Sequence, residues 1–174
     1  MKTVLIPTDF ELASLDCLSE VTNRYYPEKL NIILVHMVKM TDSITELLML
    51  SKRRVEYENI TDEFKETFND FKQNNNHLVS GIRIEFFYGN TIAAFENFLE
   101  ANDVDEIINI KNYNFKLTTK NSIDPTILVK KISHKAITID FNLIKKPYSV
   151  ASKTIVEQSV IVTDKEAKPT VVLH

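Results

Sequence analysis

The sequence predicts a three-layer α/β/α domain built around a five-stranded parallel sheet, followed by a C-terminal extension of short strands. Apolar runs of strand length alternate along residues 1–140 with longer segments whose apolar residues recur every three or four positions. Such strict alternation is typical of a parallel sheet with helices on both faces and right-handed crossovers. Residues 141–174 lie beyond this pattern and form the predicted extension.

The first two predicted strands are continuous apolar runs, as expected for strands that are buried on both faces. The first covers residues 3–6 and stops at Pro7, and the second covers residues 31–38. Helical periodicity predicts one helix between them, over about 11–25, and a longer one after them, over about 42–72.

The second half of the pattern repeats the alternation. Apolar runs predict three further strands, at residues 82–88, 106–110 and 136–139. A helix of about ten residues begins at Ile92, and another begins with Asp124 as its N-cap and Pro125 at its first helical position. Residues 111–122 form a polar loop after the fourth strand.

Composition narrows the class of protein. The chain has 174 residues, of which 44% are hydrophobic and 26% charged, as in an ordinary soluble domain. The net charge of -3, without a basic patch, argues against nucleic-acid binding. No apolar run approaches the roughly 20 residues of a membrane helix. With a single cysteine and no secretory signal pattern, we expect a cytoplasmic protein.

The opening of the chain carries a family resemblance. The first strand ends in Pro7-Thr8-Asp9, and His36 stands in the second strand, IILVHMV. These segments resemble the universal stress protein family, and the resemblance covers about residues 1–140. It implies a Rossmann-like fold of the adenine nucleotide alpha hydrolase-like type, a role in stress response, and a homodimer.

The same resemblance implies where a nucleotide would lie. Family members that bind ATP would place adenine beside Asp9 and the backbone of Met37. They hold the phosphates with Gly-x-x-Gly and, further along, Gly-Ser or Gly-Thr after the fourth strand. Here the loop 111–122 contains no glycine, and Lys111 and Asn114 stand where the first glycines would be.

Asparagine tolerates positive φ better than most residues, so asparagines could partly replace the missing glycines. If a nucleotide such as ATP or AMP binds, the candidate cofactor-binding residues are Asp9, Met37, Asn112, Asn114, Asn121 and Ser122.

Each candidate residue also has a simpler interpretation. Asp9 fits a cap or turn before the first helix. His36 fits a buried, hydrogen-bonded histidine within an apolar strand, and Cys17 fits a small buried side chain. The lysines of the loop, Lys111, Lys116 and Lys120, fit a solvated surface. No spacing resembles a metal site or a catalytic constellation, so neither is predicted.

The leading hypothesis is a non-enzymatic universal stress protein-like domain. It would act by dimerising and by binding a protein partner or ligand, without family-type ATP binding and without a cofactor. The alternative is an adenine-nucleotide-binding regulatory switch that uses Asp9 and the loop 111–122. In the extension, the apolar segments 159–162 and 170–173 predict a β-hairpin that packs on the domain or on a dimer partner.

Overall fold

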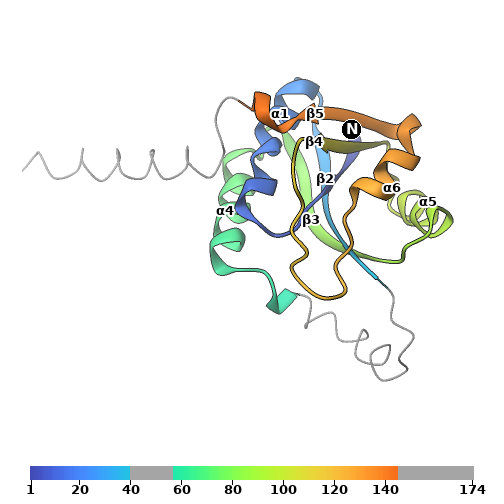
Figure 1. The fold of residues 1–174 in the computed structure, drawn as a ribbon. Coiled ribbons are helices and arrows are strands. Elements are labelled where there is room, and N and C mark those ends of the chain that lie inside the picture. Colours follow the sequence, from blue (N-terminus) through green and yellow to red (C-terminus); the bar gives the residue numbers. More distant parts are fainter. Residues whose placement is uncertain (40–56, 145–174) are drawn as a thin grey trace, which may run out of the picture.

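The computed structural model describes residues 1–39 and 57–144, which form a sheet between two helical layers (Figure 1). The sheet has five parallel strands in the order β3-β2-β1-β4-β5. Their bounds are β1 Lys2–Pro7, β2 Leu30–Val38, β3 Val79–Tyr88, β4 Glu106–Lys111 and β5 Ala136–Asp140. The predicted fold class is therefore confirmed. The predicted hairpin of the extension lies outside the described residues.

The helices divide between the two faces of the sheet. Their bounds are α1 Cys17–Tyr25, α4 Asp62–Asn74, α5 Ile92–Ala101 and α6 Thr126–Lys131, with short 3₁₀ turns η1 Leu12–Leu15, η2 Ser133–Lys135 and η3 Phe141–Leu143. Leu18 of α1 and Phe64 of α4 belong to one buried cluster. Phe95 of α5 and Leu128 of α6 belong to the other. These two cores make the three layers.

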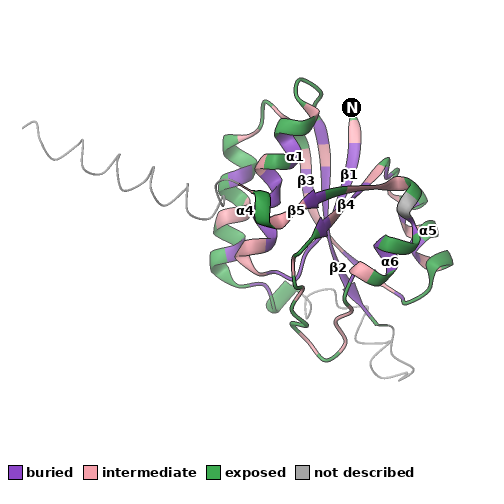
Figure 2. Ribbon diagram, turned by 45° about the horizontal axis from the view of Figure 1, so that its top comes forward, coloured by how far each residue is buried: buried purple, intermediate pink, exposed green. Residues whose placement is uncertain are grey.

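The sheet is buried because its central strands are apolar on both sides (Figure 2). Val4, Leu5 and Ile6 of β1 are each 0% exposed. Val4 and Ile6 enter the cluster beneath α1 and α4, and Leu5 enters the cluster beneath α5 and α6. This alternation follows from the period of two in a strand, and it explains why the run has no polar gaps.

The structure corrects three details of the sequence prediction. The expected helix over 42–72 is not continuous, because Thr61 caps a new helix, α4, by accepting a bond from the Phe64 amide at 3.2 Å. Residues 40–56 lie outside the described residues. The predicted helix 11–25 begins as the 3₁₀ turn η1 before α1. The helix predicted to start at Pro125, with Asp124 as its N-cap, starts at Thr126, and Pro125 is its N-cap.

The strand order reverses between β1 and β4. The chain leaves β1 through α1 on one face of the sheet and leaves β4 through α6 on the other. In open α/β sheets, ligands bind at such a switch point, beyond the carboxyl ends of the strands. Asp9 follows β1, and the segment 112–125 follows β4, so both lie at this end.

Candidate functional site

Asp9 is the acidic residue at the switch point. It is buried, with 2% of its surface exposed, and its Oδ1 accepts a hydrogen bond from the Glu11 amide at 3.1 Å. Phe10 between them has φ 64°, a left-handed conformation that is uncommon for a bulky residue. This turn directs the Asp9 carboxylate toward the loop after β4.

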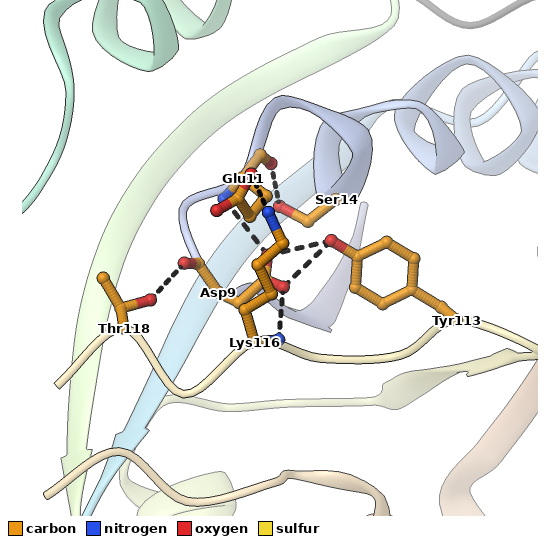
Figure 3. A network of polar contacts seen from close by, with 6 residues as sticks. All are labelled: Asp9, Glu11, Ser14, Tyr113, Lys116 and Thr118. Atoms are coloured by element: carbon orange, nitrogen blue, oxygen red, sulfur yellow. Dashed lines mark hydrogen bonds and ion pairs between the residues drawn. The ribbon is translucent and has the colours of Figure 1, made fainter. Parts of the chain in front are cut away.

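The segment after β4 folds over this carboxylate (Figure 3). The Tyr113 hydroxyl lies 2.9 Å from Asp9 Oδ1 and 3.0 Å from Oδ2. The Lys116 amide donates to Oδ2 at 2.9 Å, and the Thr118 hydroxyl donates to the Asp9 carbonyl at 2.7 Å. The Asp9 carboxylate therefore accepts hydrogen bonds from two backbone amides, those of Glu11 and Lys116, and from the Tyr113 hydroxyl.

Tyr113 is suited to stay a donor to Asp9. Its ring packs edge-on against Phe115 and Phe141, with centroids 4.8 Å and 4.9 Å away. Burial, together with the charge of Asp9 and the hydrogen bond to it, raises the pKa of the Tyr113 phenol well above its usual value. The hydroxyl consequently remains protonated at neutral pH and neutral beside the buried carboxylate.

The same loop also forms hydrogen bonds with the end of β2, where the family resemblance places the backbone that would contact adenine. The Ile123 amide donates to the Met37 carbonyl at 2.9 Å, and the Lys39 amide donates to the Asn121 carbonyl at 2.7 Å. Val38 and Ser122 form an antiparallel bridge. The loop therefore pairs with the carboxyl end of β2, and the Met37 carbonyl already accepts a hydrogen bond from the Ile123 amide.

His36 joins the loop to the core. Its Nδ1 lies 2.9 Å from the Thr8 carbonyl, which can only accept, so Nδ1 carries the proton and Nε2 accepts from Ser122 Oγ at 3.0 Å. The ring stacks on Phe10 at 4.7 Å between centroids. Burial lowers the pKa of His36, more than the Thr8 bond and Asp9 raise it. The predicted buried, hydrogen-bonded histidine is confirmed.

The predicted asparagines are not gathered around Asp9. Asn112 has φ 64°, the conformation that asparagine was expected to tolerate, but its amide donates to Asp140 of β5 at 2.9 Å. Asn114 is exposed, and Asn121 contributes its backbone carbonyl. Of the candidate cofactor-binding residues, the structure brings Asp9, Met37 and Ser122 to one loop, and a nucleotide role for all six stays a prediction.

Three contacts on Asp9 were missed by sequence reasoning, those of Tyr113, Lys116 and Thr118. Tyr113 left a signal in the sequence, because an aromatic residue in a polar loop often packs back on the domain. The Lys116 contact left none, because it is made by a backbone amide. The Lys116 side chain instead pairs with Glu11 at 3.0 Å.

Other candidates are structural. Cys17 is 0% exposed, and burial raises the pKa of its thiol to about 12, so the predicted small buried role is confirmed. Within residues 1–39 and 57–144, no group of three or more His, Cys, Asp or Glu side chains could hold a metal ion. Over the same residues, no helix has the length and apolar character to cross a membrane.

Comparison with known proteins finds similarity in solved structures alone. No protein-family model matches the chain, and no curated protein matches it. The universal stress protein UspA from Lactobacillus plantarum is 16% identical, with 79% of this chain and 97% of that chain covered and a TM-score of 0.48. A universal stress protein family member from Burkholderia pseudomallei is 10% identical, with 79% and 95% covered and a TM-score of 0.45.

The hypothetical protein MJ0577 is also similar. It is 21% identical, with 80% of this chain and 95% of that chain covered and a TM-score of 0.48. At these identities and scores we take no residue role from any of the three. The fold of this chain follows from its own sheet order and layers, and the roles of its residues follow from its own contacts.

Proposed function

We propose that this chain is a non-enzymatic universal stress protein-like domain that acts in stress response by dimerisation and by binding a partner or small ligand. In this proposal it does not bind ATP in the manner of the family. The single observation that carries the proposal is the position of the loop after β4. That loop supplies donors to the Asp9 carboxylate and to the Met37 carbonyl, the two groups that adenine would need.

The energetics favour a loop that stays in place. A nucleotide would have to displace the Tyr113 phenol and the Lys116 amide from Asp9, and the Ile123 amide from Met37. Each of these partly buried donors would need a new partner in the protein or in water, or its desolvation would cost up to about 1–3 kcal/mol. The loop also lacks glycine, so its backbone cannot approach a phosphate as closely as a glycine-rich loop does.

Thermal unfolding with and without millimolar ATP, AMP and Mg²⁺ tests this proposal. A nucleotide present at a hundred times its dissociation constant would stabilise the folded chain by about 2.7 kcal/mol. For a domain of this size that is a shift of several degrees. We expect no shift for the native sequence. A clear shift with ATP would contradict the proposal, and sedimentation at several concentrations tests the expected homodimer separately.

The adenine-nucleotide switch remains the second candidate, and one observation favours it. Residues 112–123 that cover Asp9 contain no helix and only the isolated bridge from Ser122 to Val38, so individual bonds rather than a regular element hold them. Removing the phenol with Tyr113→Phe would loosen the loop, and Tyr25→Phe is the matched control at the other end of the sheet. If ATP raises the melting temperature of Tyr113→Phe alone, the switch replaces the first proposal.

A further inference from the structure

The two edges of the sheet differ in what covers them. At the β3 edge, the Tyr57 hydroxyl donates to the Ile84 carbonyl at 3.1 Å, and its ring meets Phe86 at 5.1 Å between centroids. β5 pairs with β4 on one side, and within residues 1–39 and 57–144 no strand lies on its other side. About half of the backbone groups of such an edge strand face outward and can pair with another strand.

A groove of about 650 Å³ lies beside this open edge, between β5 and α1. Ile139, Leu143 and Ile144 give it an apolar side, and Leu143 is 74% exposed. Glu20 and Arg24 of α1 contribute the polar side. Of the three apolar side chains, Leu143 is exposed, Ile144 is half-buried and Ile139 is buried. An open strand edge beside a partly apolar groove is the arrangement that receives an added strand, with side chains entering the groove and backbone pairing with the edge.

We propose that residues 159–162 of this chain pair with β5 as an added strand and cover this groove within the same molecule. The chain outside the described fold begins at the groove itself, because Ile144 lines it. The stretch 145–158 can span up to about 45 Å, which is enough to turn and return along β5. This inference does not depend on what the carboxyl end of the sheet binds.

The segment 159–162 fits an added strand better than the segment 170–173 does. Val160, Ile161 and Val162 are β-branched and carry an amide at every position, and Thr163 continues the run. The second segment follows Pro169, which has no amide to donate to a ladder. A sheet edge pairs through consecutive backbone groups, so the first segment is the occupant that we assign.

The tether favours pairing within one molecule over pairing with a second copy. A covalent connection such as residues 145–158 holds the two segments that it joins at an effective concentration of up to about the millimolar range. Free chains at micromolar concentration compete poorly with a tethered segment.

Disulfide trapping tests the pairing directly. Thr138 of β5 is exposed, so Thr138→Cys is combined in turn with Val160→Cys, Ile161→Cys and Val162→Cys. Cys17 is fully buried and does not compete. We expect a disulfide within one chain for at least one pair, seen as a monomer on a non-reducing gel and located by peptide mass mapping. Disulfides only between chains would show that a second copy covers the β5 edge. The absence of a disulfide in every pair would show that residues 159–162 do not pair with β5.

Two controls keep the test specific. Thr138→Cys with Val172→Cys should cross-link at least tenfold more slowly, and an equal rate would overturn the choice of segment. Hydrogen exchange then compares the double variant Val160→Asp/Val162→Asp with Val171→Asp/Val172→Asp. We expect the outward amides of residues 136–140 to exchange at least tenfold faster in the first variant and unchanged in the second. Unchanged exchange in both overturns the proposal.

Discussion

The two ends of the sheet each hold a carboxylate against a tyrosine hydroxyl, but the tyrosines belong to different kinds of structure. At the amino end, Tyr25, the last residue of α1, donates to Glu106, which also pairs with Lys2 of β1. At the carboxyl end, Tyr113 of the loop after β4 donates to Asp9. The same bond therefore joins regular elements at one end and holds an irregular loop at the other.

The bonds at the amino end strengthen elements that are already fixed, whereas the bonds at the carboxyl end hold a loop in its position. Lys2, Tyr25 and Glu106 sit in β1, α1 and β4, which strand pairing and core packing already hold in place. The loop after β4 belongs to no helix or strand, so its individual bonds to Asp9, to Met37 and to His36 decide where it lies. Variants at the amino end should change global stability slightly, and variants at the carboxyl end should also release the loop.

The largest effect is expected at Asp9. Asp9→Ala removes the acceptor for two amides and a phenol, and we expect the free energy of unfolding to fall by about 3 kcal/mol. That corresponds to roughly 10 °C in melting temperature for a domain of this size. Urea and thermal unfolding measure both quantities.

A milder pair keeps this prediction testable if Asp9→Ala does not fold. Asp9→Asn retains the shape of the side chain, but its new amide group faces the Glu11 and Lys116 amides and the Tyr113 hydroxyl, which are themselves donors. In Glu106→Gln the neighbouring side chains can bond to water instead, since Glu106 is 22% exposed. Asp9→Asn should therefore be the more destabilising of the two. If both variants lower the free energy of unfolding equally, the two ends of the sheet are stabilised alike and the proposed difference between them is wrong.

The two tyrosines give the next largest effect and the clearest contrast. Tyr113→Phe should cost about 1.5 kcal/mol, because the Asp9 carboxylate loses one donor and keeps two amides. Tyr25→Phe should cost less than about 1 kcal/mol, because Lys2 still pairs with Glu106. Hydrogen exchange separates them further, since amides of residues 112–123 should exchange faster only in Tyr113→Phe. Faster exchange there in both variants would contradict a local role for Tyr113.

The sheet was predictable from the sequence, and the closure of its carboxyl end was not. Runs such as 3–6 and 31–38 are buried on both faces, so their apolar pattern alone marks them as central strands. Asp9 could be placed at the end of a strand for the same reason. Its partners could not, because they come from a distant loop whose path depends on tertiary contacts.

The missed contacts show where pattern reasoning stops. Backbone donors such as the Lys116 and Ile123 amides carry no side-chain signature, so composition cannot reveal them. The tolerance of asparagine for positive φ predicts that Asn112 can replace a glycine, and Asn112 does adopt positive φ, but its side-chain amide donates to Asp140. The backbone preference of asparagine predicted the conformation of Asn112, but the direction of its side chain depends on Asp140 in β5.

As the pH falls, acid should begin to weaken the carboxyl end of the sheet before the amino end. The folded pKa of His36 lies below its ordinary value of 6.5 because the ring is buried, so the unfolded chain binds the proton first. Stability is complete above about pH 6.5 and is lost as the pH falls from there toward the folded pKa. Partial burial acts to raise the pKa of Glu106, but bonds from Lys2 and Tyr25 outweigh it and hold it below 4.5.

The contribution of Glu106 is therefore lost only as the pH falls below about 4.5 toward its lowered pKa. Urea unfolding between pH 7.5 and pH 5 isolates the histidine. His36→Gln can keep both bonds, to Thr8 and to Ser122, without titrating. We expect the native chain to lose stability over this range and His36→Gln to lose clearly less. The same slope in both proteins would place the titrating group elsewhere.

The smallest effect is expected at Lys116, and it tests whether the backbone or the side chain holds the loop. The Lys116 ammonium pairs with Glu11 at 3.0 Å, but the two side chains are 68% and 45% exposed. Surface pairs of this kind contribute little, so Lys116→Ala should change the free energy of unfolding by less than about 0.5 kcal/mol. The amide bond to Asp9 is retained, and exchange over residues 112–123 should match the native chain. A loss as large as that of Tyr113→Phe would mean that the ion pair with Glu11, rather than Asp9, keeps the loop closed.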